Sequence, residues 1–151
     1  LPIRSDNLKI LGVWAYNHRA KKFGNNVSGE TINAIECYKE WLSDGELPCV
    51  FGGDFNNSVI WDKPNNKNNF QNINTHLESL GFTSAYHTNT GDDFGCEGSA
   101  TFFHTKQESK KYHIDYMYLQ SLKCNSVEVG RYEDWIKLSD HVPVRVEVDA
   151  L

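Results

Sequence analysis

Runs of apolar residues with two different periods predict a domain built from both strands and helices. Residues 8–16 (LKILGVWAY) are short, apolar and aromatic, which is typical of a buried strand. A polar segment, residues 17–29, follows it. Apolar residues at helical spacing then predict a helix over residues 30–43, with one face on a sheet. Asp44 and Gly45 end this helix.

The rest of the chain contains more predicted strands than helices. Residues 48–53 (PCVFGG) have the pattern of a second buried strand, and residues 70–80 predict a second amphipathic helix closed by Gly81. Further strands are expected at residues 101–104, 112–119, 124–131 and 142–148. This order predicts an α/β fold, a layered sandwich with a mixed β-sheet and helices on one face.

Length and composition indicate one globular domain. The 151 residues suit a single domain, and a hydrophobic content of 39% with 23% charged residues excludes a disordered chain. The net charge of -5 argues against a surface that binds nucleic acid all over. It does not exclude a nuclease, because the carboxylates that hold a metal ion are themselves acidic.

Cysteines and membrane signals leave the compartment open. The sequence has no CxxC pair, so a zinc site is not expected. Each cysteine lies in or beside an apolar run, which favours buried free thiols over disulfides. No stretch approaches the roughly 20 apolar residues of a membrane helix, and the chain does not open with a signal peptide. We therefore expect a soluble protein, and the cytoplasm is the expected compartment.

The first run with possible chemistry is Gly53-Asp54-Phe55-Asn56, at the end of the second predicted strand. Ligands of α/β folds gather at strand ends. If strand geometry continues, Asp54 and Asn56 project to the same side. The alternative is an ordinary turn, because Gly, Asp and Asn all favour turns.

Two further runs place carboxylates and histidines beside strands. Asp115 lies in the alternating segment His113-Ile114-Asp115-Tyr116, where a carboxylate is costly unless paired or bound to a cation. Strand periodicity puts His113 and Asp115 on one face, and a solvated edge strand is the alternative. Ser139-Asp140-His141 precedes the last strand and is suited to placing a base or a metal ligand. A loop cap is the alternative there.

Taken in order, the three runs resemble the signature of the endonuclease/exonuclease/phosphatase superfamily, in particular its exonuclease III-like and deoxyribonuclease-like members. The similarity extends from the first predicted strand to the last. It implies a layered α/β sandwich of the deoxyribonuclease-like type and hydrolysis of phosphodiester bonds that depends on a divalent metal.

The resemblance also implies a role for each residue of the three runs. Asp54 would orient or deprotonate the attacking water, and Asn56 would hydrogen-bond the phosphate. Asp115 would orient the catalytic histidine, His141, which would contact the phosphate. Asp140 would be a metal ligand, and Mg²⁺ or Mn²⁺ suits such an oxygen-rich site better than zinc does.

The end of the first strand matches a family element near the substrate phosphate. Tyr16 is the direct match and a candidate catalytic residue. Asn17 and His18 become phosphate-binding candidates if the alignment shifts by one or two residues. Arg19 could also meet a phosphate, although a solvated loop cation is favoured. For His104, core packing or surface exposure is favoured over a contact with substrate.

The resemblance covers only the second half of the family fold and the strand before it. The Asn and Glu that hold the metal in the family's N-terminal half have no candidate in this chain. Residues 1–151 are therefore interpreted as the C-terminal part of a single catalytic domain, a fragment of the four-layer fold. We expect this chain alone to bind Mg²⁺ weakly and to hydrolyse little. We also expect it either to form a homodimer through its exposed sheet face or to be only marginally stable.

Three functions are compatible with these residues. A nuclease that acts on DNA or RNA is favoured, because many members of the family are nucleases. A phosphodiesterase or phosphatase for phosphoinositides, sphingolipids or small phosphoesters is the second hypothesis. A non-catalytic binding module is the third. Low basicity counts against the first, the lack of an amphipathic membrane segment against lipids, and the intact candidate residues against the third.

Overall fold

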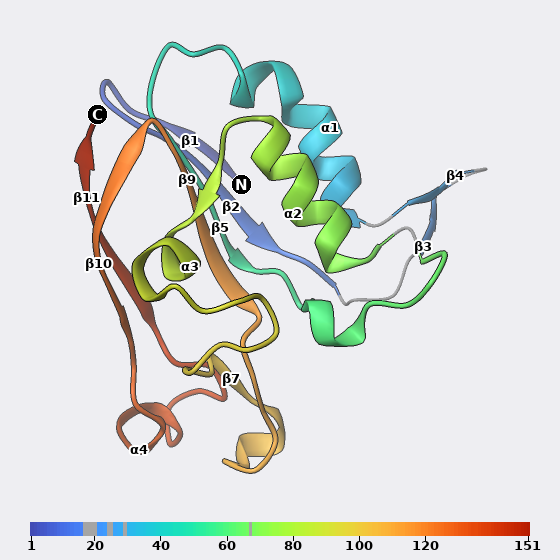
Figure 1. Ribbon diagram of the computed structural model, residues 1–151, viewed down its shortest axis with the longest axis vertical. Helices are drawn as coiled ribbons and strands as arrows, with labels where there is room; N and C mark the ends of the chain where they lie inside the picture. The colour runs from blue at the N-terminus through green and yellow to red at the C-terminus, as the bar shows by residue number, and fades with distance from the viewer. Residues whose placement is uncertain (17–20, 24–25, 29, 67) are drawn as a thin grey trace.

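A five-stranded sheet runs through the centre of the chain (Figure 1). The computed structural model describes residues 1–16, 21–23, 26–28, 30–66 and 68–151. In spatial order the strands are β1 (Pro2–Arg4), β2 (Lys9–Trp14), β5 (Cys49–Asp54), β9 (Asp115–Gln120) and β6 (Thr83–Ser84). β2 and β5 are parallel, whereas β1–β2, β5–β9 and β6–β9 are antiparallel. The mixed sheet predicted from the sequence is confirmed.

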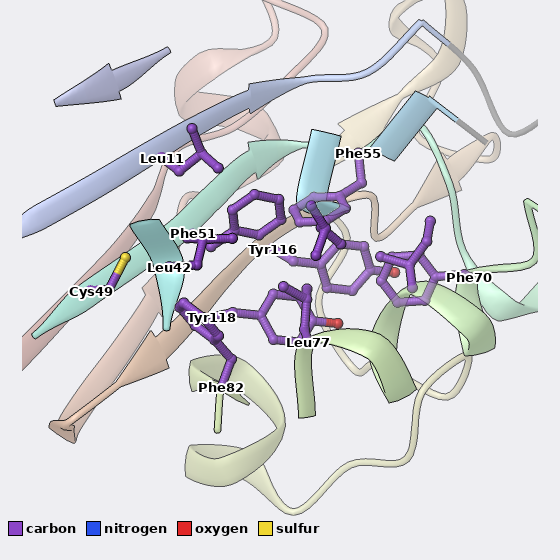
Figure 2. Close-up of a cluster of buried hydrophobic side chains, with 12 residues drawn as sticks. Leu11, Leu42, Cys49, Phe51, Phe55, Phe70, Leu77, Phe82, Tyr116 and Tyr118 are labelled. Atoms are coloured by element: carbon purple, nitrogen blue, oxygen red, sulfur yellow. The ribbon is translucent and has the colours of Figure 1, made fainter. Parts of the chain in front are cut away.

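Two helices cover one face of this sheet, as the apolar spacing predicts (Figure 1). They are α1 (Glu30–Leu42) and α2 (Phe70–Ser79), each within a residue of its predicted end. The core between helices and sheet is largely aromatic (Figure 2). Phe55 lies at its centre, with ring centroids 5.7 Å from Phe51, 5.9 Å from Phe70 and 5.5 Å from Tyr116. Edge-on aromatic packing of this kind stabilises a core beyond the area it buries.

The other elements lie outside the five-stranded sheet. β10 (Leu122–Val129) and β11 (Val144–Ala150) pair antiparallel, with α4 (Tyr132–Trp135) between them in the chain. α3 (Ala85–Thr90) packs against β9 and β10. The remaining short elements are β3 (Lys21–Phe23), β4 (Asn26–Ser28), the 3₁₀ turns η1 (Val59–Trp61) and η2 (His104–Lys106), β7 (Phe102–Phe103) and β8 (Lys111–Tyr112).

The predicted strand over residues 112–119 is interrupted, and this is a correction. β8 ends at Tyr112 and β9 begins only at Asp115. His113 bonds through its ring to the carbonyl of Ser99, and the next two amides donate to the hydroxyl of Thr101. These bonds replace ladder bonds, so the period of two that placed His113 and Asp115 on one face does not hold across the break.

The structure also contains short elements that the sequence does not predict, because their apolar residues show no clear helical or strand period. α3 was not expected, because its sequence AYHTNT has no helical apolar period; Gly91, in the left-handed conformation at φ 76°, ends it. The segment predicted as a polar loop, residues 17–29, contains β3 and β4, which pair with each other.

The sheet face opposite α1 and α2 is less well buried. Ile10, Val50 and Met117 come from the three central strands, alternate with the core residues there, and are only partly buried. The homodimer expected through this face stays a prediction.

All four cysteines are free. Cys49 is buried, as predicted, but Cys37 and Cys96 are exposed, which corrects the expectation of buried thiols. Cys37 lies on the outer side of α1, and Cys96 follows a turn closed by a bond from its amide to the Asp93 carbonyl. Within the described residues, no helix has the length and apolar character needed to span a membrane.

Candidate active site

The sheet brings two carboxylates together at one edge. Asp54, the last residue of β5, is paired in register with Asp115, the first residue of β9, and with Trp14, the last residue of β2. Paired residues of neighbouring strands project to the same face, so the two aspartates, some 60 residues apart in the chain, become neighbours there. The aromatic core that contains Phe55 holds this end of β5 in place.

Asn56 reaches the same edge through a turn, not through continued strand geometry. Its φ is 46°, a left-handed conformation that Asn tolerates better than most residues. Its backbone amide donates to Asp54 Oδ1 at 2.8 Å. Its side-chain Nδ2 donates to Asp54 Oδ2 at 2.8 Å and to the Ala15 carbonyl at 2.9 Å. Both side-chain donors are therefore engaged, and Asn56 must release one of them to bind a phosphate oxygen.

His141 lies between the two aspartates. Its Nδ1 is 2.9 Å from Asp115 Oδ2, and its Nε2 is 4.0 Å from Asp54 Oδ2. A carboxylate accepts hydrogen bonds, so Nδ1 carries the proton and the tautomer is set by Asp115. The ring also packs on Phe102, with centroids 4.7 Å apart, and the His141 amide donates to Ser139 Oγ at 3.0 Å. Asp115 and Phe102 therefore contact the imidazole itself, and Ser139 fixes the backbone of His141.

The electrostatics of the cluster favour a charged imidazole beside a carboxylate that holds its proton more readily than usual. The hydrogen bond that His141 donates to Asp115 is the main cause that raises the pKa of His141. Burial is the main cause that raises the pKa of Asp54, and the nearby charges of Asp115 and Asp140 act in the same direction. A carboxylate with a raised pKa is a better proton acceptor than an ordinary aspartate.

This architecture is shared with solved structures, although no family model and no curated protein sequence matches the chain. An endonuclease/exonuclease/phosphatase family protein from Leptotrichia buccalis superposes on 98% of the chain with a TM-score of 0.61 at 14% identity. The 3′ phosphatase NExo from Neisseria superposes on 98% with a TM-score of 0.63 at 18% identity. The chain has the endonuclease/exonuclease/phosphatase fold. The human Nocturnin catalytic domain also shares it, over 95% of the chain, with a TM-score of 0.53 and 16% identity.

The chain spans part of each of these proteins. It covers 51% of the Leptotrichia protein, 63% of NExo and 46% of the Nocturnin domain. The predicted α/β class and deoxyribonuclease-like type are thus confirmed as a fold, and the chain accounts for about half of the endonuclease/exonuclease/phosphatase architecture.

Asp140 precedes His141 in the chain and lies beside the cluster of Asp54, Asp115 and His141, but these residues do not form a complete metal site. It is half-buried, and its carbonyl accepts a hydrogen bond from the Phe103 amide at 2.8 Å. Across the described residues, no three His, Cys, Asp or Glu side chains converge closely enough to hold a metal ion. The side chains present therefore do not fit a resident cation by themselves, and the metal role of Asp140 stays a prediction.

Of the candidates that follow β2, the structure describes only Tyr16. Tyr16 is 68% exposed and follows Ala15, whose amide donates to the Asp54 carbonyl at 2.8 Å. The predicted phosphate-binding residues Asn17, His18 and Arg19 lie outside the described residues. His104 lies in η2 and is exposed.

A second group of polar side chains is buried around His113, and of its members the sequence analysis considered only His113. His87 Nε2 is 3.3 Å from Glu97 Oε1, and His87 Nδ1 is 2.7 Å from Ser84 Oγ. His113 is also buried; its Nδ1 is 2.8 Å from the Ser99 carbonyl, and its Nε2 is buried without a hydrogen-bond partner. Residue type was the only signal in the sequence, because these side chains come from three separate segments.

The burial of His113 predicts a loss of stability in acid. Burial lowers its pKa, so the folded-state pKa lies below the unfolded value of about 6.5. The stability that neutral His113 provides is complete above the unfolded pKa and is lost as the pH falls through the folded pKa. The free energy of unfolding measured in urea should therefore fall more on acidification for wild type than for His113→Gln. The variant His104→Gln, at an exposed position, should show the same pH dependence of unfolding free energy as wild type. An equal pH dependence for His113→Gln and wild type would contradict the prediction.

Proposed function

We propose that the chain is part of an endonuclease/exonuclease/phosphatase catalytic domain that hydrolyses phosphodiester bonds with a divalent metal, most simply as a nuclease. One observation carries the proposal. His141 is held by Asp115 through Nδ1 and presents Nε2 within 4.0 Å of the Asp54 carboxylate. A histidine oriented by one carboxylate and facing another is the arrangement needed to donate to a phosphate while the second carboxylate handles the water.

Each residue would contribute one part of the hydrolysis. Asp54 orients the attacking water and accepts its proton, helped by its raised pKa. His141, charged and held by Asp115, donates from Nε2 to a phosphate oxygen as negative charge builds there. Asn56 adds a second donor once it releases Asp54 or Ala15. Asp140, together with the family's Asn and Glu ligands that have no candidate in this chain, would hold the divalent cation, which would supply neutralisation of charge on the phosphate.

The side chains at the edge of the site support nucleic acid as the substrate. Trp14 is 88% exposed and lies beside Asp54 in register. An exposed aromatic ring beside a phosphate site provides a surface on which bases stack without regard to sequence. NExo, which shares this fold, is seen bound to a product DNA hairpin. Single-stranded or frayed DNA or RNA therefore suits the site better than a lipid headgroup.

A panel of substrates tests the proposal. The natural protein, with any residues upstream of this chain, is assayed with Mg²⁺ or Mn²⁺ on single-stranded DNA, abasic duplex DNA and a phosphoinositide. We expect the DNA substrates to be cleaved. Asp140→Ala should lower the rate by at least about 100-fold, comparable with removing one stabiliser of transition-state charge.

The control for this experiment is Asp134→Ala, which removes an exposed carboxylate of α4 that pairs with Arg131 at the surface. Its rate should equal that of wild type. Cleavage of the phosphoinositide alone would favour the second hypothesis of the sequence analysis. Full activity of Asp140→Ala, or no hydrolysis of any substrate, would contradict the proposal.

A further inference from the structure

Thr101 contacts both segments that carry the Asp115–His141 pair. Its side chain is fully buried, at 0% exposure, just before β7. Its Oγ1 accepts hydrogen bonds from the Ile114 and Asp115 amides, both at 3.1 Å. Its carbonyl accepts the amide of Val142, the residue after His141, at 2.9 Å. A single residue thus bonds to the backbone of Asp115 and to the backbone next to His141.

The hydroxyl of Thr101 supplies, at the start of β9, the hydrogen-bond acceptor that a neighbouring strand would otherwise supply. The Asp54 carbonyl faces β2, where it accepts the Ala15 amide, so the Asp115 amide opposite it points away from β5. On that far side of β9, the described strand β6 reaches only Tyr118 and Leu119. The Asp115 amide therefore has Thr101 Oγ1 as its acceptor, and this bond determines where β9 begins.

We propose that Thr101 is a positioning residue: its hydroxyl sets the place of Asp115, and its carbonyl sets the place of His141, so that the two side chains meet. This inference rests on the proposed function of that pair. Its physical basis is the short reach of a hydrogen bond, which weakens steeply outside a narrow range of distance and angle. His141 Nδ1 is 2.9 Å from Asp115 Oδ2, although the two residues are 26 positions apart in the chain. A small shift of either segment would therefore break this hydrogen bond.

The substitution Thr101→Val tests whether the hydroxyl positions Asp115, because valine removes the hydroxyl with little change in side-chain shape. Thr101→Val leaves the Ile114 and Asp115 amides buried without their acceptor, and the start of β9 must move to find another. Thr101→Ser keeps the acceptor. Thr31→Val, which removes another buried hydroxyl, in α1 and outside the site, is the matched control.

The readout is the tautomer of His141, measured by long-range ¹H–¹⁵N NMR at a pH where the ring is neutral and without added metal. In wild type the Nδ1–H tautomer should dominate, because Asp115 accepts that proton. In Thr101→Val the two ring nitrogen signals should move towards each other as the bias is lost. Thr101→Ser should restore the wild-type spectrum, and Thr31→Val should not change it. A wild-type His141 spectrum in folded Thr101→Val would overturn the proposal.

A second measurement needs no variant that risks unfolding. The Ile114 and Asp115 amides of wild type and of Thr101→Ser should be protected from hydrogen exchange, and rapid exchange at both would overturn the proposal. Neither readout depends on hydrolysis. Failure of the proposed function would appear as absent hydrolysis with the tautomer response intact, whereas failure of this inference would leave the tautomer unaffected by position 101.

Discussion

Replacing Asp115 by asparagine is expected to lower phosphodiester hydrolysis by up to about 10⁴-fold while the chain stays folded, the loss known for the equivalent change in a serine-protease triad. Asp115 accepts the Nδ1 proton of His141 at 2.9 Å. An asparagine amide can instead donate to Nδ1, which stabilises the tautomer with the proton on Nε2 only and removes the support for the charged ring. His141 would then be a poor donor to a negatively charged phosphate.

The same substitution should lower the pKa of His141, since the bond to Asp115 is the main cause that raises it. A raised folded-state pKa contributes stability that is complete below the unfolded value of about 6.5 and is lost as the pH rises through the folded pKa. The stability difference between wild type and Asp115→Asn should therefore be larger at acid pH than at alkaline pH. NMR titration of the His141 ring and urea unfolding at both pH values measure the two effects.

Asp134→Asn is the control for Asp115→Asn, because it makes the same chemical change on the exposed surface of α4. It should alter neither the rate of hydrolysis nor the titration of His141. An Asp115→Asn protein with wild-type activity would show that the pair does not act in the reaction. Full activity with a lowered His141 pKa would show that the pair exists but the chemistry lies elsewhere.

The central strands and the two long helices could be predicted from the sequence, because each has one face buried in a single core. Leu11 and Phe51 alternate with less buried neighbours along their strands. Ile35 and Leu42 in α1, and Ile73 and Leu77 in α2, recur at helical spacing. Local pattern therefore contained the information. The break between Tyr112 and Asp115 could not be predicted, since it depends on bonds to Ser99 and Thr101, which are 13 or 14 residues away from their partners.

The candidate site shows the same division. Asp54, Asp115 and His141 could be chosen because the three runs that contain them resemble, in order, the signature of a known superfamily. The sheet register brings Asp54 and Asp115 together, and His141 bonds to Asp115. The conformation of Asn56 could not be predicted, because its left-handed turn places the side chain by hydrogen bonds to Asp54 and Ala15 instead of by strand periodicity. A turn and a functional site are therefore not exclusive at residues 53–56, because the turn at Asn56 is what places its side chain beside Asp54.

Phe55→Ala is expected to cost about 3–5 kcal/mol of unfolding free energy, the range for removing a large buried aromatic side chain. Phe55 has 0% exposure and packs edge-on against Phe51, Phe70 and Tyr116, so truncation leaves a cavity that the surrounding rings cannot fill without leaving their own contacts (Figure 2). A domain of ordinary stability has only about 5–15 kcal/mol in total. The variant should therefore be close to unfolding at moderate temperature.

The position of Phe55 in the chain makes this more than a core defect. Its neighbours on either side are Asp54 and Asn56, and the Phe55 amide donates to the Ile114 carbonyl, next to Asp115, at 2.9 Å. Loss of the ring should loosen both sides of the site together. Urea unfolding measures the cost, with Phe55→Leu expected to fall between wild type and alanine. Ile60→Ala, at a position 52% exposed, should change stability by no more than about 0.5 kcal/mol. A cost below about 1 kcal/mol for Phe55→Ala would mean that the ring is not the anchor that holds the site to the core.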